Sequence, residues 1–195
     1  METNAMKTIL VCDIETNNDS YPDGKPKFDF FNDDPIQIAF GIYEGRQKIC
    51  EDELLLKTPN LRPTIEKFTG ITKTMLDEKG IGHRAAAGIW KDIFRSYSPN
   101  VVVEHNLITF DWVILTNWLL RTCASENFIL PVVPHISDTM KRGSLWMHGV
   151  NGKWPKLKDL AKELGINVDE SKLHNALYDI ELCAQCHFKL EDIGF

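Results

Sequence analysis

The chain has 195 residues, of which 43% are hydrophobic and 26% are charged. This size suffices for one hydrophobic core and leaves little room for a second, so we expect a single domain over residues 1–195. No apolar run is long enough to span a bilayer, and residues 1–7 lack the basic and apolar segments of a signal peptide. We therefore expect no membrane association, a cytoplasmic (intracellular) location, and little structure in residues 1–6.

The formal net charge is −6, whereas a nucleic-acid-binding protein is expected to carry a basic patch. The charge therefore argues mildly against a nucleic-acid partner. It does not exclude one, because a cluster of metal-binding carboxylates contributes negative charge that bound cations neutralise. Basic residues in the last third of the chain fit either a local basic segment or an ordinary solvated face. They are Lys141, Arg142, Lys153, Lys156, Lys158 and Lys162.

Three strands are expected in the first third of the chain. Lys7–Asp13 is a short apolar, β-branched run that ends in an acid, which is typical of a buried strand with polar chemistry at its carboxyl end. Residues 17–34 are rich in Asn, Asp, Pro and Gly and predict a long loop. Pro35–Tyr43 and Gln47–Lys57 read as strands, and the turn Glu44–Arg46 between them predicts an antiparallel hairpin.

Helices and strands alternate in the rest of the chain. Apolar spacing and turn signals predict helices over Pro63–Phe68, Thr72–Glu78, His83–Tyr97, Leu107–Arg121, Leu157–Leu164 and Leu173–Leu190. Short buried strands are expected at Val101–Val103 and Pro131–Ser137. This order of elements predicts an α/β fold, with a mixed five-stranded sheet flanked by helices in a single domain.

Three acidic residues stand at the ends of these elements. Asp13 and Glu15 are two residues apart at a strand end, so their side chains point to the same face. Two carboxylates that close repel one another unless a cation lies between them, although alone the pair also fits an exposed acidic strand end. Asp111 lies near the start of an apolar helix. There it can complement the helix dipole, or, close to the buried side, it needs a partner or a metal.

A histidine and a fourth acid lie near the start of the last helix. Within a helix, His174 and Asp179 would be separated by about 140° around the axis and would not share a face. His174 therefore fits the helix entrance, with Asp179 fixed inside the helix and pointing inward. That arrangement suits a movable base beside a fixed metal ligand. Taken alone, His174 also fits a surface or capping residue.

Together the fragments ILVCDIET, EHNLITFDWVIL and KLKDLAKELGI followed by LHNALYD resemble the three motifs of the DEDD 3′–5′ exonuclease superfamily. The form H-x-A-x-x-D of the last motif is similar to that of the DEDDh branch, which includes polymerase-proofreading enzymes. The resemblance extends from Lys7 to about Leu190. Phe68 departs from the pattern, since many members carry histidine near this point. Three residues, where many members have two, separate His105-Asn106 from Phe110-Asp111, and the loop over residues 17–34 is longer and more acidic than a minimal member needs.

The resemblance implies an RNase H-like fold and two bound Mg²⁺ or Mn²⁺ ions that support hydrolysis of DNA from its 3′ end, with release of 5′-mononucleotides. It implies that Asp13 bridges both metals, Glu15 and Asp179 complete one site, Asp111 acts largely through water, and His174 is the general base. Five further residues are the implied contacts to substrate: Ile14, Thr16, Phe68, Leu107 and Trp112. Core packing is an alternative role for the last three, and is slightly preferred for Trp112.

Two other functions remain open at this stage. One is an RNA 3′–5′ exonuclease of the same fold, since discrimination depends on contacts around the 2′-hydroxyl. The other is a non-catalytic module that grips a strand end or a DNA polymerase, which the complete set of acidic residues argues against. Residues 183–187 read CAQCH, the string that attaches c-type haem. We expect no haem, because such attachment needs export and the string falls in the middle of a predicted helix.

Overall fold

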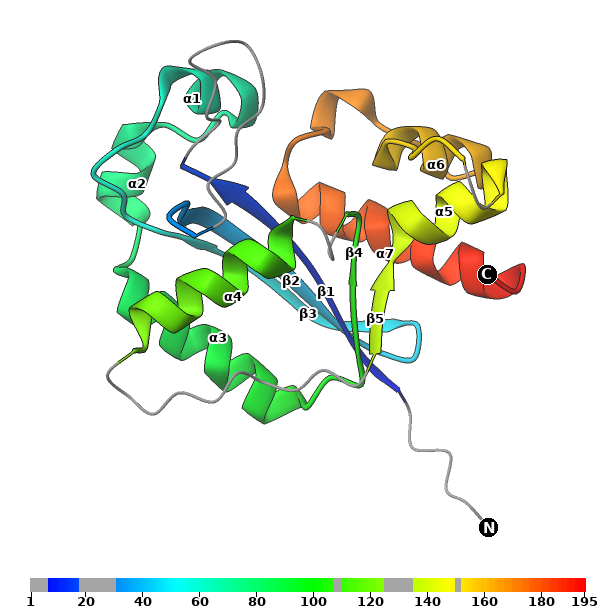
Figure 1. Cartoon of the computed structure of the whole chain (residues 1–195), viewed down its shortest axis with the longest axis horizontal. Helices are drawn as coiled ribbons and strands as arrows, with labels where there is room; N and C mark the ends of the chain where they lie inside the picture. Colours follow the sequence, from blue (N-terminus) through cyan, green and yellow to red (C-terminus); the bar gives the residue numbers. More distant parts are fainter. Residues whose placement is uncertain (1–6, 18–30, 107–109, 125–134, 150–151) are drawn as a thin grey trace.

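The computed structural model describes residues 7–17, 31–106, 110–124, 135–149 and 152–195. Within them, one five-stranded sheet runs through the molecule with helices on both faces (Figure 1). The strands are β1 (Thr8–Thr16), β2 (Pro35–Glu44), β3 (Gln47–Leu55), β4 (Val101–Glu104) and β5 (His135–Asp138). Their order across the sheet is β3-β2-β1-β4-β5. The predicted α/β class and mixed five-stranded sheet are confirmed.

The central strand β1 joins an antiparallel half of the sheet to a parallel half. It pairs antiparallel with β2, which forms the predicted hairpin with β3 around Gly45. On its other side β1 is parallel to β4, with Val11 opposite Val103, and β4 is parallel to β5, with Glu104 opposite Asp138. The carboxyl ends of these three strands therefore meet at one edge of the sheet, and each ends in acidic residues.

Alternate residues of β1 face the two helical layers. Leu10, Cys12 and Ile14 pack against α3 (His83–Tyr97) and α4 (Asp111–Thr122). The intervening residues Ile9 and Val11 pack against α7 (Ala176–Asp192). Because side chains alternate along a strand, Asp13 and Glu15 continue the row of residues that faces α7.

The remaining helices flank these layers. They are α1 (Pro63–Thr69), α2 (Lys73–Lys79), α5 (Thr139–His148) and α6 (Leu157–Glu163), with a 3-10 turn over Glu170–Lys172. Helices α5 and α6 pack beside α7, where Leu160, Leu182 and Leu190 form a small separate core. The sequence did not predict α5, which directly follows β5 and is capped by the Asp138 carboxylate through the amides of Met140 and Lys141.

Most predicted boundaries agree with the structure to within three residues. Strand β1 continues to Thr16, so Asp13 and Glu15 lie inside the strand rather than at its end. The predicted helix Leu173–Leu190 begins only at Ala176, which leaves His174 outside it. Residues 18–30 of the predicted loop and residues 131–134 of the predicted strand lie outside the described part of the chain.

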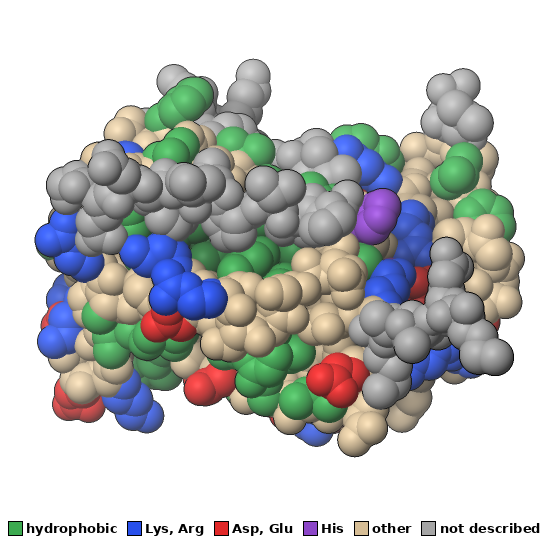
Figure 2. Space-filling view, turned by 90° about the horizontal axis from the view of Figure 1, so that it is seen from below, with side chains coloured by type: hydrophobic (Ala, Val, Ile, Leu, Met, Phe, Trp, Pro, Cys, Tyr) green, Lys and Arg blue, Asp and Glu red, His purple; other side chains and the backbone are tan. Residues whose placement is uncertain are grey.

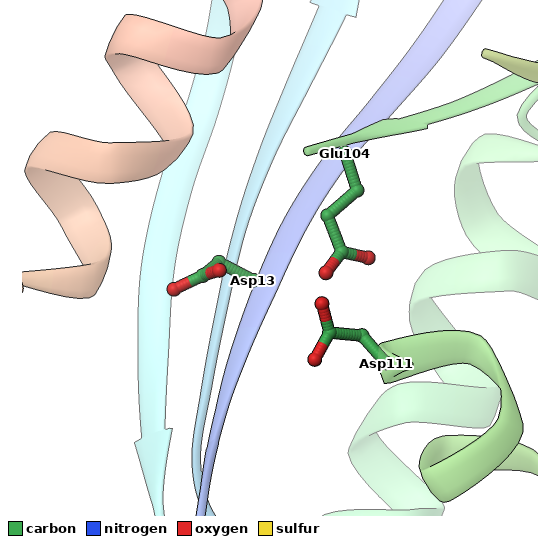
Figure 3. Close-up of side chains that lie close together, drawn as sticks. All are labelled: Asp13, Glu104 and Asp111. Atoms are coloured by element: carbon green, nitrogen blue, oxygen red, sulfur yellow. The ribbon is translucent and has the colours of Figure 1, made fainter. Parts of the chain in front are cut away.

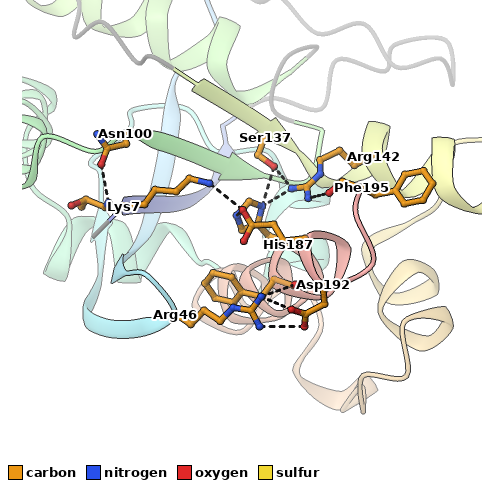
Figure 4. Close-up of polar contacts among 11 residues, drawn as sticks. Lys7, Arg46, Asn100, Ser137, Arg142, His187, Asp192 and Phe195 are labelled. Carbon is orange, nitrogen blue, oxygen red and sulfur yellow. Dashed lines mark hydrogen bonds and ion pairs between the residues drawn. The ribbon is translucent and has the colours of Figure 1, made fainter. Parts of the chain in front are cut away.

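The carboxyl-terminal half of α7 is braced by polar contacts (Figure 4). Arg46 forms an ion pair with Asp192 at 2.5 Å, and Lys7 forms one with Glu191 at 3.0 Å. His187 is only 2% exposed, and its Nδ1 lies 3.0 Å from the Ser137 hydroxyl. The CAQCH string is thus part of the interior of α7, with both of its thiols buried. No helix in the described residues has both the length and the apolar character needed to cross a membrane.

Candidate active site

Asp13 and Glu15 lie next to one another on the α7 side of the sheet, half-buried near the carboxyl end of β1. Burial raises the pKa of Asp13 well above its ordinary value, and the charges of Glu15 and Asp179 raise it further. Burial also raises the pKa of Glu15 to about 7, again with help from Asp179. Each shift has the same physical cause: carboxylates are held close together away from water, so their charged forms are disfavoured.

Asp111 enters from the opposite side of the sheet as the first residue of α4, and it is 5% exposed. Burial raises its pKa well above the ordinary range, followed by the charges of Asp13 and Glu15. One oxygen of Asp111 lies within 4.8 Å of an oxygen of both Asp13 and Glu104, which are likewise within that distance of each other (Figure 3). Glu104 was not among the predicted site residues.

Asp179 and His174 form the third side of the site. The helix α7 starts after Asn175, whose side chain accepts a hydrogen bond from the Tyr178 amide. His174 precedes this cap in a left-handed conformation, with φ of 66°, and its amide donates to Asp179 Oδ2 at 3.0 Å. Burial raises the pKa of Asp179 to about 6, while the hydrogen bond from His174 acts in the opposite direction. As predicted, His174 lies at the helix entrance and Asp179 inside the helix.

The side chains of Asp13, Glu15, Asp179 and His174 line one cleft of about 290 Å³. Its walls are formed by Asp13, Glu15, His105, Lys156, Leu157, Lys158, Leu173, His174 and Asp179. The lining thus combines three acidic residues with two lysines and two histidines. The sequence left open whether these lysines belong to a solvated face, and the structure places Lys156 and Lys158 at the cleft.

His105 links the segment that precedes Lys156 and Lys158 to the sheet. Its Nε2 lies 3.0 Å from the carbonyl oxygen of Pro155, and its Nδ1 lies 3.0 Å from the Thr139 hydroxyl. Burial lowers the pKa of His105, although the contact with the Pro155 carbonyl raises it. The ring therefore holds the segment before Lys156 against the ends of β4 and β5.

The predicted substrate residues differ in their surroundings. Phe68 is 61% exposed, and its ring centroid lies 4.4 Å from that of His174, at the rim of the site. The side chains of Ile14 and Thr16 are buried, so a substrate could reach these residues only through their main chain. Trp112 is half-buried against the α3–α4 core, in line with the packing role preferred for it. Leu107 lies outside the described residues.

Glu104 and His105 are polar residues of the site that the sequence interpretation missed, although both stand in the motif that contains Asp111. A signal for Glu104 was available. It is the first charged residue after the apolar run Val101–Val103, just as Asp13 follows the apolar residues of β1. Since parallel strands bring their carboxyl ends to one edge, the pairing of β1 with β4 places the two acids at neighbouring strand ends.

The arrangement is chemically suited to divalent cations. Carboxylate oxygens are the ligands that Mg²⁺ and Mn²⁺ prefer, and a bound cation removes the repulsion that helps to raise the pKa values of the site.

Charges of both signs lie on the surface outside the cleft. On the face in Figure 2, the described Lys and Arg side chains form separate groups toward both ends, with acidic side chains between them.

Comparisons with known proteins agree with this geometry. A family model for exonucleases, RNase_T, matches residues 10–186. Zinc-bound E. coli exonuclease I in complex with single-stranded DNA superposes with a TM-score of 0.71 at 19% identity, covering 97% of this chain and 41% of that one. Exonuclease I from Methylocaldum szegediense gives a TM-score of 0.68 at 20% identity, covering 96% and 41%.

The chain thus spans less than half the length of these structural relatives. Among curated proteins, no sequence matches it. The family model nevertheless covers the three acidic motifs, which lie on β1, α4 and α7. The chain therefore belongs to the exonuclease family and carries an exonuclease domain with the RNase H-like fold of the DEDD type, as its sequence motifs predict.

Proposed function

We propose that the protein is a metal-dependent 3′–5′ exonuclease that releases 5′-mononucleotides from single-stranded DNA. The observation that carries the proposal is the cleft in which Asp13, Glu15, Asp179 and His174 meet, with Asp111 against Asp13. These five residues come from β1, α4, α7 and the turn before α7. Their convergence supports a catalytic role over a purely binding one, because buried carboxylates that repel one another would otherwise only destabilise the fold.

The residues fit two divalent cations with Asp13 between them. On the α7 side, Glu15 and Asp179 are the charges that raise the pKa of Asp13, whereas on the α4 side Asp111 lies within 4.8 Å of it. We assign Asp13, Glu15 and Asp179 to one cation and Asp13 with Asp111 to the other. Bound Mg²⁺ or Mn²⁺ would stabilise the negative charge on the attacking and leaving oxygens of the phosphodiester.

His174 is proposed as the general base. Its main chain is fixed by the hydrogen bond to Asp179, while its side chain is exposed at the cleft and contacts Phe68. A neutral imidazole ring at this point can take the proton of the attacking water.

The substrate would enter along the rim of the cleft. Lys156 and Lys158 supply positive charge for backbone phosphates, and the exposed ring of Phe68 offers a surface on which a terminal base can stack. Glu15, with the main chain of Ile14 and Thr16, would hold the terminal 3′-hydroxyl. DNA is favoured over RNA because the E. coli relative was solved with single-stranded DNA. A DNA polymerase partner and an intracellular location stay predictions from the sequence.

The direct test is digestion of 5′-labelled single-stranded DNA with Mg²⁺, compared between a 3′-hydroxyl and a 3′-phosphate end. We expect a ladder of shortened, still labelled products and release of 5′-mononucleotides, with the 3′-phosphate blocking attack. The Asp13→Asn variant, purified in parallel, controls for contaminating nucleases. Equal rates on both ends would contradict the role of Glu15 in holding the 3′-hydroxyl. Faster digestion of the matching RNA would mean that RNA, and not DNA, is the preferred substrate.

A further inference from the structure

Glu104 is a buried acid that is not one of the four carboxylates expected to bind metal. It is the last residue of β4 and is 1% exposed. Its Oε2 receives only a weak contact from the Cys12 thiol, with the sulfur 3.6 Å away. Its Oε1 is buried and has no hydrogen-bond partner among the described residues. A carboxylate in this state is costly unless a charge of opposite sign reaches it.

The neighbours of Glu104 add to this cost instead of offsetting it. Asp13 and Asp111 each place an oxygen within 4.8 Å of one of its own, and Figure 3 shows the Glu104 and Asp111 carboxylates pointing toward one another. The nearby thiol of Cys12 supplies no positive charge: burial and then the charges of Asp111 and Asp13 raise its pKa well above the ordinary value, so it stays a neutral, weak donor. The main chain of Glu104 is meanwhile held firmly by the Thr139 hydroxyl, which donates to its carbonyl oxygen.

We propose that Glu104 is a fifth carboxylate of the metal centre, with Oε1 binding the cation that Asp13 and Asp111 hold. This inference rests on the proposed metal-dependent function and adds a ligand beyond the four that the exonuclease motifs imply. Oxygen donors from three different elements, β1, β4 and α4, would then surround that cation. The orphaned oxygen gains a partner, and the repulsion among the three acids becomes attraction to a shared charge.

The geometry assigns Glu104 to one cation only. Along β4, Val102 packs on the α3–α4 side and Val101 and Val103 on the α7 side, so alternation places Glu104 on the α4 side. Glu15 and Asp179 lie on the α7 side, and neither belongs to the group of three oxygens. Loss of Glu104 should therefore weaken one class of metal site and spare the other.

The test is a titration of the whole chain with Mn²⁺ in the absence of nucleic acid, in which free Mn²⁺ is followed by electron paramagnetic resonance. The variant Glu104→Gln keeps the shape of the side chain and removes its charge. We expect it to weaken one class of Mn²⁺ site by more than roughly tenfold, the loss typical of even an indirect partner of a metal. Glu104→Asp keeps the charge, and its affinity should lie between those of Glu104→Gln and the wild type.

Two controls separate ligation from other effects. Asp138→Asn neutralises another buried acid nearby yet keeps the acceptor that caps α5, so it should leave Mn²⁺ affinity within about twofold of wild type. Thermal unfolding in EDTA checks the fold: Glu104→Gln should unfold at a higher temperature than wild type, because one repelling charge is gone, and should gain less on addition of Mn²⁺.

The outcomes distinguish this inference from the proposed function. Wild-type affinity in Glu104→Gln, with affinity lost in Asp13→Asn, would overturn the role of Glu104 and leave the metal-dependent function standing. An equal loss of Mn²⁺ affinity in Glu104→Gln and Asp138→Asn would also overturn it, since the removal of any nearby negative charge would then explain the loss. Absence of Mn²⁺ binding by the wild-type chain would overturn both proposals.

Discussion

At the scale of single residues, the proposed function separates acidic groups that bind cations from a histidine that accepts a proton. Asp13 and Asp111 have strongly raised pKa values because they are buried beside other acids. His174 lies outside that buried group, exposed at the rim of the cleft, and its main-chain amide donates to Asp179. The two kinds of residue should therefore fail in different ways when they are replaced.

His174→Ala should lower turnover by ~10²–10⁴-fold, the range typical of a general base, and leave Mn²⁺ affinity nearly unchanged. Asp13→Asn should lower both, because it removes a carboxylate that faces both groups of ligands. Single-turnover rates across the neutral pH range, together with Mn²⁺ titration of each variant, measure the difference. An unchanged rate in His174→Ala would exclude the base role, and Mn²⁺ affinity lost as badly as in Asp13→Asn would make His174 a ligand instead.

Much of the site could be predicted from residue spacing. The pair Asp13 and Glu15 shares a face of β1 because strand side chains alternate, and Asp179 is set five residues after His174 by the motif. The distance between Asp111 and Asp13 could not be predicted by spacing, because it depends on how α4 packs against β1. Glu104 went unnoticed because its partners come from other elements: the parallel pairing of β1 with β4 brings it near Asp13, and the packing of α4 brings it near Asp111.

At the scale of elements, α5 shows where local sequence fails to predict structure. Its middle residue is Gly143, an unfavourable residue inside a helix. The structure explains the glycine: a Cβ at this position would lie 2.6 Å from Leu160 Cδ1. Helix α5 can thus approach α6 closely, and the packing of Leu160 compensates for the poor helix propensity. The spacing of apolar residues in the sequence does not reveal packing of this kind. The strongly periodic α3, in contrast, was predicted with its correct boundaries.

Two glycine substitutions test this explanation. Gly143→Ala should lower the free energy of unfolding by about 1–3 kcal/mol, because the added methyl group overpacks the contact with Leu160. Gly88→Ala, in α3, is the matched control: nothing lies within 4 Å of the position that its methyl group would take, so it should stabilise by about 0.5–1 kcal/mol. Urea unfolding of both variants in EDTA gives the comparison. A stabilising Gly143→Ala would mean that the two helices do not pack closely.

At the scale of the whole molecule, α7 connects the site to the opposite end of the sheet. Its first turn carries Asp179, and its last turns are fixed by Arg46, Lys7 and Arg142 to the β2–β3 hairpin, the start of β1 and helix α5. The whole helix lies along the sheet (Figure 1). Loss of the brace at one end should therefore be measurable as a loss of global stability.

The polar contacts at the end of α7 should weaken on acidification, because His187 is buried among them. Burial lowers the pKa of His187 to about 4; the positive charges of Arg142, Lys7 and Arg46 act in the same direction, and Glu191 acts against them. An unfolded chain binds the proton near pH ~6.5. Between these values the unfolded state takes up the proton first, so stability falls as pH falls from ~6.5 to about 4, by at most roughly 3 kcal/mol.

Urea unfolding of wild type and His187→Gln at several pH values in this window measures the effect. The variant should show a shallower loss of stability, while the acids of the active site contribute equally to both proteins and cancel in the difference. His135→Gln, at an exposed position in β5, should keep the wild-type slope. Parallel pH curves for wild type and His187→Gln would contradict the role of His187 in the acid response.

The central claim is that a cleft of mutually repelling carboxylates hydrolyses DNA only when divalent cations join them. The most direct measurement is release of 5′-mononucleotides from single-stranded DNA after the metals are stripped with EDTA, followed by stepwise addition of Mg²⁺ or Mn²⁺. We predict that release stops in EDTA and returns with either cation, with Asp13→Asn inactive throughout. Undiminished release in EDTA would contradict the account.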